Sequence, residues 1–294
     1  MATVSMDLVK QLRDKTQIGM MDCKKALEEA EGDFDKALEL LRKKGAAVAA
    51  KRADNVTNHG RVESFISDDN KTAVIVETAC ETDFSANTDA MKQFAISVAK
   101  NLAHTDAATI EDIFLQPVVD DTKGLTVKHL LEELIAKICE NIKLTRFARF
   151  QVAGNGMVNV YIHPGSTIGV MVELTTDKDA SAHLDALKQI AKDVCMQAAV
   201  TNPVCVRPAE MDPAVLEIER RLANEQMQAS GKPANVIEKI IEGKVAKFYQ
   251  DACLLNQPFI KNDKQTVEQY VNEASKNLGL AVTVKQFRRF AIGR

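Results

Sequence analysis

Residues 60–103 read GRVESFISDDNKTAVIVETACETDFSANTDAMKQFAISVAKNLA, and residues 156–199 read GMVNVYIHPGSTIGVMVELTTDKDASAHLDALKQIAKDVCMQAA. The two stretches align without a gap at a constant offset of 96 residues. About sixteen of the forty-four aligned positions are identical, among them Glu77 with Glu173 and Asp83 with Asp179. Such self-similarity indicates an internal duplication, which has to be identified before a fold is assigned.

Each copy predicts the same order of elements. Two β-branched runs are joined by a polar turn, SDDN in the first copy and HPGS in the second, and a loop and an amphipathic helix follow. A second pair of segments, residues 126–150 and 266–290, extends the repeat with a helix and a strand that ends Phe-X-Arg-Phe, at an offset of 140. Each copy is therefore expected to be an α+β layer whose helices cover one face of a sheet.

The difference between the two offsets places about 44 extra residues in the second copy. The segment DPAVLEIERRLANEQMQASGKPANVIEKIIEGKVAKFYQD supplies them, and its two helical runs predict a projecting helical hairpin, of coiled-coil type, at about residues 212–252. Gly231 suits the end of the first helix and Pro233 the first turn of the next. A projecting hairpin usually touches another molecule, and the alternative is a decoration packed on its own domain.

The first 45 residues predict three short helices. Asp33 suits an N-cap, and Gly32 and Gly45 suit C-terminal stops. A unit this small has a thin core and should lean on a partner or expose an apolar edge, for which Met20 and Met21 are candidates. The expected division of the chain is a three-helix domain (1–45), a linker (46–58), a first α+β subdomain (59–154) and a second one with the hairpin (155–294).

Composition excludes several classes of function. The net charge of −3 and the pI near 6.0 argue against a non-specific nucleic-acid binder, because such binding depends on neutralising phosphates. No apolar run is long enough to span a bilayer and the N-terminus lacks a signal peptide, so we expect no membrane role and a cytoplasmic location. The six cysteines form no CxxC pair, which indicates reduced thiols and no metal site. Nucleotide, zinc-protease and acyl-transfer motifs are absent, so neither catalysis nor a cofactor is expected.

An acidic cluster near Cys80 is the remaining candidate for chemistry. Glu77, Glu81 and Asp83 could form an acid–base site, and a hydrolase that uses Cys80 or this cluster is a weak hypothesis. Glu77 and Asp83 recur in the second copy, whereas Cys80 is replaced by Thr176. Shared carboxylates at a junction between strand and helix more simply favour the positive end of a helix dipole.

Phe84 differs from its neighbours because the second copy has Ala180 at this position while it keeps the flanking Asp, Ser and Ala. The repeated scaffold therefore does not require an aromatic ring here. A hydrophobic staple around an N-cap Ser85 would need an apolar residue at position 89, which is Asp89. Two alternatives remain: a contact with a satellite core, or an exposed ring that is presented to a partner.

Two segments, LRDKTQIGMMDCKKAL (12–27) and ETACETDFSAN (77–87), closely resemble the signatures of the elongation factor Ts family, the guanine nucleotide exchange factors of elongation factor Tu. The resemblance continues through HPGSTIGV and SGKP to the final strand and so covers essentially the whole chain. This chain has Gln17 where the family usually has glycine, Ala79 where it has asparagine, and Ser85 where it has valine.

The resemblance implies a ubiquitin-associated-like N-terminal domain, a duplicated core and a hairpin insertion. It implies that Thr82, Asp83 and Phe84, with Ser85 in the same loop, enter the G domain of elongation factor Tu and disturb its bound magnesium. It further implies contacts with that factor at three N-terminal positions and one position in the second copy: Leu12, Met20, Met21 and His163. The complex would be a heterodimer or a 2:2 assembly.

A rival hypothesis from another class is an adaptor that binds a peptide or a ubiquitin-like partner through the three-helix unit.

Overall fold

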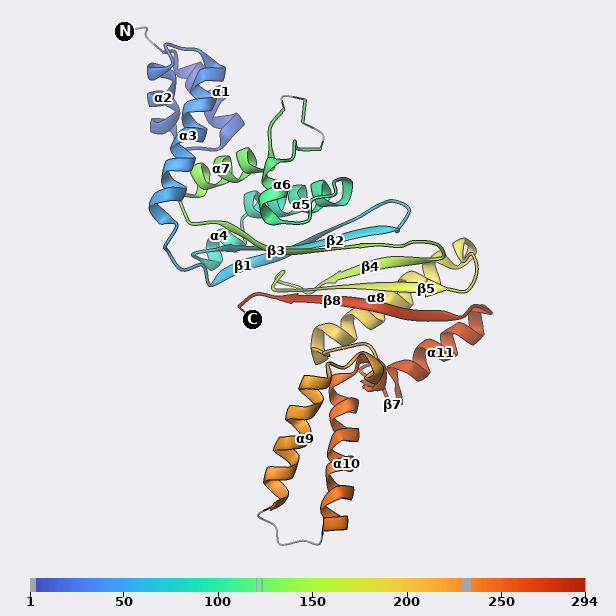
Figure 1. Cartoon of the computed structure of the whole chain (residues 1–294). Coiled ribbons are helices and arrows are strands. Elements are labelled where there is room, and N and C mark those ends of the chain that lie inside the picture. Colours follow the sequence, from blue (N-terminus) through green and yellow to red (C-terminus); the bar gives the residue numbers. More distant parts are fainter. Residues whose placement is uncertain (1–3, 120, 123, 229–233, 294) are drawn as a thin grey trace.

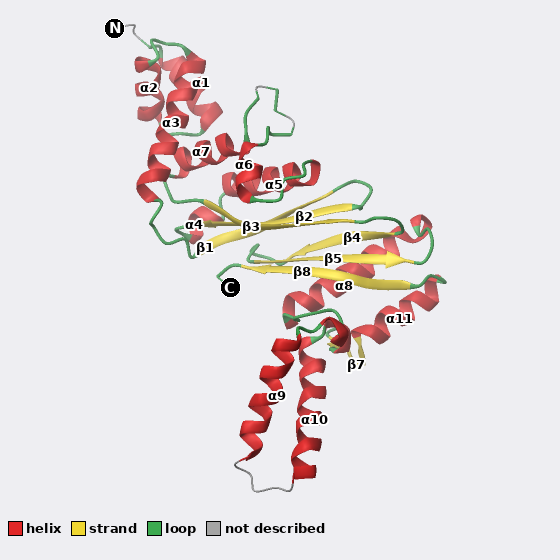
Figure 2. Ribbon diagram, viewed as in Figure 1, coloured by secondary structure: helices red, strands yellow, loops and turns green. Residues whose placement is uncertain are grey.

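The computed structural model describes residues 4–119, 121–122, 124–228 and 234–293. The chain is a mixed α+β protein: N-terminal helices lead into two small antiparallel sheets that lie face to face, with further helices on their outer faces (Figure 1; Figure 2). A pair of long helices projects from the second sheet. The expected α+β class, with N-terminal helices and small antiparallel sheets, is confirmed.

Both sheets are three-stranded meanders. The first has the order β1-β2-β3, with bounds His59–Ile66, Thr72–Cys80 and Lys143–Gln151. The second has the order β4-β5-β8, with bounds Gly156–Ile162, Ile168–Thr176 and Val282–Ala291.

The strand registers of the two sheets match at the offset seen in the sequence. Gly60 pairs with Ala79 in the first sheet, and Gly156 pairs with Thr175 in the second. The register of β2 on β3 shifts directly after Glu77, and that of β5 on β8 shifts after the equivalent residue. The repeat in the sequence therefore specifies not only the strands but also how they pair.

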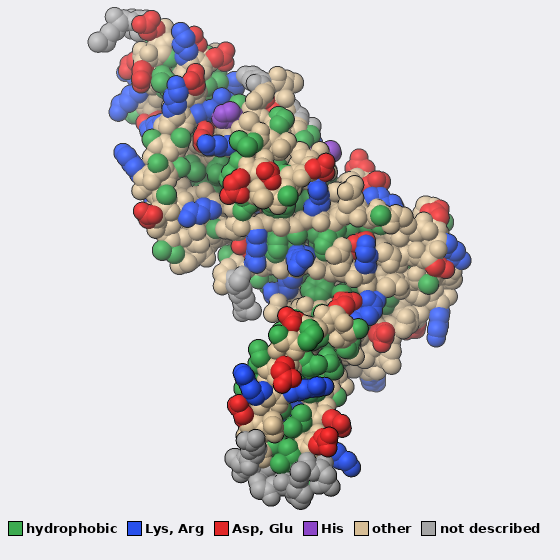
Figure 3. Space-filling model, viewed as in Figure 1, with side chains coloured by type: hydrophobic (Ala, Val, Ile, Leu, Met, Phe, Trp, Pro, Cys, Tyr) green, Lys and Arg blue, Asp and Glu red, His purple; other side chains and the backbone are tan. Residues whose placement is uncertain are grey.

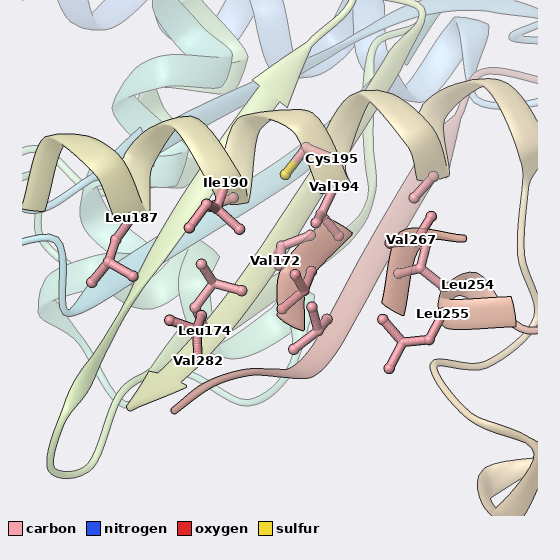
Figure 4. Packing of buried hydrophobic residues seen from close by; sticks show 14 of the residues in the cluster. Val172, Leu174, Leu187, Ile190, Val194, Cys195, Leu254, Leu255, Val267 and Val282 are labelled. Carbon is pink, nitrogen blue, oxygen red and sulfur yellow. The ribbon is translucent and has the colours of Figure 1, made fainter. Parts of the chain in front are cut away.

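Each sheet is covered by helices on its outer face. Helices α5 (Asp89–His104) and α7 (Val127–Ile138) pack on the first sheet, and α8 (Leu184–Thr201) and α11 (Val267–Leu278) pack on the second. Figure 4 shows the second of these cores: Leu187, Ile190 and Val194 of α8 lie over Val172 and Leu174 of β5. The predicted helix-covered sheet face is present in both copies.

The inner faces of the two sheets pack against each other. Val62 and Ile75 of the first sheet and Val158 and Met171 of the second belong to one buried cluster, and none of these four has exposed surface. Because successive strand residues point to opposite faces, β2 is buried on both sides, and its sequence is accordingly a nearly continuous apolar run. At Gly169 an added Cβ would lie 2.5 Å from a Val62 methyl carbon, so this close approach requires glycine.

Basic side chains gather over β3 and β8 at one edge of this sandwich (Figure 3). Arg146, Arg149 and Arg288 line a groove there together with phenylalanines of both strands. The guanidinium carbon of Arg146 lies 4.6 Å from the centre of the Phe290 ring, a cation–π contact that joins the two sheets.

The N-terminal helices are α1 (Met6–Thr16), α2 (Met20–Glu29) and α3 (Phe34–Arg52). The Asp33 side chain accepts from two backbone N–H groups of α3, which confirms the predicted N-cap. Gly32 follows α2 with φ of +86° and donates its N–H to Leu27 O, so the predicted stop is also confirmed. Gln17 caps α1 in the left-handed region, with φ of 59°. Glycine adopts this conformation more readily than glutamine.

The expected helix stop at Gly45 is wrong. Helix α3 continues through Gly45 to Arg52, so residues 46–52 of the expected linker are helical. An added Cβ at Gly45 would lie 2.1 Å from Glu132 O of α7. Gly45 therefore lets two helices approach closely, and the division of the chain into domains at this point stays a prediction.

The projecting hairpin consists of α9 (Pro213–Gln228) and α10 (Ala234–Ala252). This confirms the two predicted helical runs, whereas the roles expected for Gly231 and Pro233 fall outside the described residues.

Across the described part of the chain, none of the helices has the length and apolar character that a membrane span requires. The remaining short elements are α4 (Asp83–Ala86), α6 (Ile110–Leu115), η1 (Ser181–His183), η2 (Pro208–Glu210), η3 (Leu254–Asn256), β6 (Pro258–Phe259) and β7 (Asn262–Thr266).

Candidate functional site

Phe84 lies on the single-turn helix α4 and is 83% exposed. Thr82 caps this turn, since its hydroxyl accepts from the Ser85 backbone N–H at 3.3 Å. Ser85 and Ala86 are buried beneath the turn. The contact with a satellite core that the sequence left open is therefore absent, and the turn presents the ring to solvent.

Glu140, in the connection between α7 and β3, holds the start of this turn. One of its carboxylate oxygens accepts from the backbone N–H groups of Glu81 and Thr82, both at 3.1 Å. The other accepts from the Thr82 hydroxyl at 2.7 Å. Hydrogen bonds to a carboxylate are stronger than those between neutral groups, so Glu140 anchors the loop that carries Phe84.

Glu81 ties the same loop to the end of α3. Its carboxylate accepts from the Asn141 backbone N–H at 2.6 Å, from Arg52 at 3.0 Å and from the Asn55 amide at 2.9 Å. The Asn141 hydrogen bond is the main reason that the pKa of Glu81 is lowered, so the carboxylate stays charged at neutral pH.

Arg61 of β1 connects α4 to the second copy. Its guanidinium donates to Ala86 O at 2.7 Å and to Glu63 at 3.0 Å, and it approaches the Ser166 hydroxyl at 3.4 Å. Ser166 lies in the β4–β5 turn that also carries His163, and its carbonyl accepts from the Val62 N–H at 2.6 Å. The tertiary structure thus brings the turn of His163 to the end of the sandwich where Phe84 is exposed (Figure 1).

The N-terminal candidates separate into two groups. Met20 is half-buried, whereas Met21 is 64% exposed and is available to a partner. Leu12 has no exposed surface in the free chain and packs in the core of the three-helix unit, and its contact with a partner stays a prediction. Helix α3 belongs to this unit and runs on to Arg52, which binds Glu81 beside the Phe84 turn.

The helix-dipole interpretation of the shared carboxylates is wrong for one of the two pairs. Glu77 lies within β2 and pairs with Arg146 at 2.7 Å, and Glu173 lies within β5 and pairs with Lys285 at 2.8 Å. Both are buried at the point where the strand register shifts. Asp83 alone lies in the first turn of a helix, α4. The shared glutamates therefore stabilise the sheets.

Cys80 is not placed for nucleophilic chemistry. It is fully buried, and burial is the main cause that raises the pKa of its thiol to about 11. The reactive thiolate is therefore scarce at neutral pH. Within the part of the chain that the structure describes, no group of three His, Cys, Asp or Glu residues could hold a metal ion. The burial of Cys80 and its raised pKa oppose the weak hypothesis of a hydrolase that uses this thiol.

Comparison of the two copies distinguishes the interactions that both copies share from the residues that only the first copy has. The Asn141 N–H to Glu81 bond recurs in the second copy as Ala281 N–H to Asp177, at 2.9 Å, so this bond belongs to the shared fold. Glu140 and Phe84, in contrast, align with Leu280 and Ala180, and Arg61 aligns with Met157. Sequence reasoning found Phe84 in this way and missed Glu140 and Arg61, although the same comparison of copies marks them.

A family model described as "Elongation factor TS" matches residues 81–294. A protein named elongation factor Ts from Clostridium novyi (strain NT) is 41% identical over 290 residues, which cover 99% of this chain and 93% of that protein. One of the same name from a Nitratiruptor species is 42% identical with the same coverage. The similarity spans the N-terminal helices, both sheets and the hairpin.

Proposed function

This chain belongs to the elongation factor Ts family, the nucleotide exchange factors of elongation factor Tu in translation elongation, and from this premise we propose that Phe84 is its main acting group. It is an exchange factor and not an enzyme. The observation that carries the proposal is an aromatic ring, 83% exposed, on a turn anchored by Glu140.

The proposed action is mechanical. In P-loop GTPases a magnesium ion links the nucleotide phosphates to the protein, and magnesium demands near-ideal octahedral geometry. A ring that enters the G domain beside the ligands of the ion weakens the site with a small displacement. The loop that carries the ring must be rigid for this, because a mobile ring would move aside and leave the magnesium site undisturbed. The hydrogen bonds of Glu140 and Glu81 supply that rigidity.

Thermodynamic linkage makes the action reciprocal. If the factor weakens binding of GDP to its partner, GDP weakens binding of the factor by the same ratio. A coupling free energy of about 4 kcal/mol corresponds to roughly a thousandfold change in GDP affinity. Rebinding of GTP then expels the factor, which can act repeatedly in the cytoplasm.

The remaining features support secondary contacts. We assign the N-terminal unit as ubiquitin-associated-like and propose that it touches the same partner through Leu12, Met20 and Met21. His163, at the end of the sandwich near Phe84, is proposed to touch that partner as well. Thr82 and Asp83 shape the loop, and buried Ser85 supports it from below. The matching strand registers support a duplicated core, and α9 and α10 support a coiled-coil insertion. The complex is proposed to be a heterodimer or a 2:2 assembly, without direct nucleic-acid or membrane contact.

The test is release of a fluorescent GDP analogue from elongation factor Tu. We expect the native chain to accelerate release and Phe84→Ala to lose most of that acceleration, tenfold or more, without loss of folding stability. Leu115→Ala is the matched control, because Leu115 is also a large exposed apolar residue (75%) but lies on α6. Equal rates for native and Phe84→Ala chains would remove Phe84 from the mechanism. Stable binding that is indifferent to the nucleotide would instead favour the adaptor.

A further inference from the structure

Two cysteines face each other at the base of the projecting hairpin. The sulfur atoms of Cys205 and Cys253 are 3.5 Å apart, although the residues are 48 positions apart in the chain. Cys205 precedes α9 and Cys253 directly follows α10, so the pair lies where the hairpin leaves and rejoins the body. None of the interactions that hold Phe84 involves either residue.

The backbone already holds the two chains side by side. Cys205 and Cys253 form a parallel β-bridge. Val204 N–H donates to Ala252 O at 2.8 Å, and Leu254 N–H donates to Cys205 O at 2.9 Å. Neighbouring chains at this spacing keep their Cα atoms within the range that a disulfide spans, and a bond of about 2.05 Å needs only a small rotation of the side chains.

We propose that Cys205 and Cys253 are a dithiol modification site, which a low-molecular-weight disulfide such as oxidised glutathione converts reversibly to an intramolecular disulfide. The Cys205 thiolate attacks one sulfur of the oxidant, and the first glutathione leaves as a thiolate. Cys253 then attacks the mixed disulfide at the Cys205 sulfur, and the second glutathione leaves. Two protons pass from the protein thiols to the two released thiolates, so two protein thiols are oxidised and one small disulfide is reduced.

Exposure sets the order of the two steps. Cys205 is 8% exposed and Cys253 has no exposed surface, so the small disulfide reaches Cys205 first. Burial raises the pKa of both thiols, that of Cys253 to about 12. The thiolate is the attacking species, so the reaction is slow at neutral pH and accelerates as pH rises. In the described part of the chain no third residue completes a metal site with the pair.

The modification would close the hairpin at its base. The whole of α9 and α10 lies between the two cysteines, so the new bond encloses the insertion in one covalent loop. The existing hydrogen bonds already hold this geometry, so the fold of the body stays as it is. We expect slower amide hydrogen exchange at residues 204–206 and 252–255 in the oxidised form.

The test treats the folded, full-length chain with oxidised glutathione at pH 8.5 and counts thiols after denaturation. Six cysteines are present, so four free thiols should remain. Peptide mapping identifies any glutathione adducts on the other cysteines, which are then added back to the count of free thiols. A peptide that links Cys205 to Cys253 is expected. Cys253→Ser should stop at a glutathione adduct on Cys205, and Cys205→Ser should leave Cys253 unmodified. Cys139→Ser removes the one exposed cysteine and should form the link as the native chain does.

Two results would overturn the proposal. One is a native chain in which Cys205 and Cys253 stay reduced while Cys139 forms a mixed disulfide. The other is a link that appears only when the chain is unfolded, as monitored by circular dichroism during oxidation. Peptide mapping and circular dichroism of the native chain decide these two questions, so the test does not depend on whether any variant folds.

Discussion

Glu140 is the side chain that makes Phe84 a rigid group. Its two carboxylate oxygens accept three hydrogen bonds from Glu81 and Thr82, at the start of the turn. The second copy, in which Leu280 replaces it, also lacks the ring. Ring and anchor thus occur together in the one copy and are absent together from the other, as expected if the anchor serves the ring and not the fold.

The charge and both acceptor oxygens of Glu140 are expected to matter. In Glu140→Gln the amide nitrogen cannot accept, so at least one hydrogen bond is lost and the free energy of unfolding should fall by about 1–2 kcal/mol. We expect faster hydrogen exchange at residues 81–88 and slower nucleotide release from the partner. Glu111→Gln, at an exposed position of α6, is the control and should leave the exchange of residues 81–88 unchanged. Unchanged exchange in Glu140→Gln would refute the anchoring role.

Helix α3 is the element that links the N-terminal unit to the sheets. It packs along α7 and ends at Arg52, which binds Glu81 beside the Phe84 turn. The side chain of Arg42 also donates to Glu133 of α7 at 2.6 Å. Close contact of α3 with α7 at Gly45 therefore determines where the N-terminal unit sits relative to the loop.

Two helical glycines allow a matched comparison of this contact. Gly45→Ala places a carbon 2.1 Å from a backbone oxygen of α7, so the helices must move apart and the free energy of unfolding should fall by about 1–3 kcal/mol. Gly243→Ala in α10 meets no atom within 4 Å and should raise it by about 0.5–1 kcal/mol, because alanine favours the helix. Denaturant titration of both variants measures the difference. A Gly45→Ala chain as stable as the native one would show that α3 is not fixed on α7.

At the scale of the molecule the body and the hairpin are separate units. The body is a sandwich whose two sheets share one buried layer. The hairpin joins it through a small cluster at its base, which contains four buried residues, Cys205, Met211, Ala252 and Cys253, and four partly buried ones, Val215, Leu216, Phe248 and Tyr249. Because the far part of the hairpin adds nothing to the cores of the body, the body should fold without it.

Replacement of residues 217–247 by a short Gly-Ser linker keeps every member of that cluster. We expect the truncated chain to unfold cooperatively with nearly the same denaturant midpoint, while its helical circular dichroism falls by the share of the removed residues. A large drop in the midpoint, or an insoluble product, would show that the hairpin contributes to the stability of the body. Nucleotide release with the truncated chain then reports whether the hairpin contacts the partner.

Local patterns in the sequence determined much of this protein. Strand alternation and helical periodicity predicted both sheets, their covering helices and the hairpin, because these signals depend on residues near one another in the chain. The offset of the repeat, which needs only the sequence, located the insertion. The difference between Phe84 and Ala180 likewise identified the ring without any structure. Asp33 was predictable as a cap for the same local reason.

Only the tertiary structure decided the rest, because these features depend on residues brought together from distant parts of the chain. Gly45 resembles a helix stop until Glu132 of α7 is found against it, and only the packing of the three helices shows that Leu12 lies in their core. Glu140 reaches Thr82 across 58 positions, and Cys205 meets Cys253 across 48. No local propensity encodes such approaches, because they follow from the packing of whole layers.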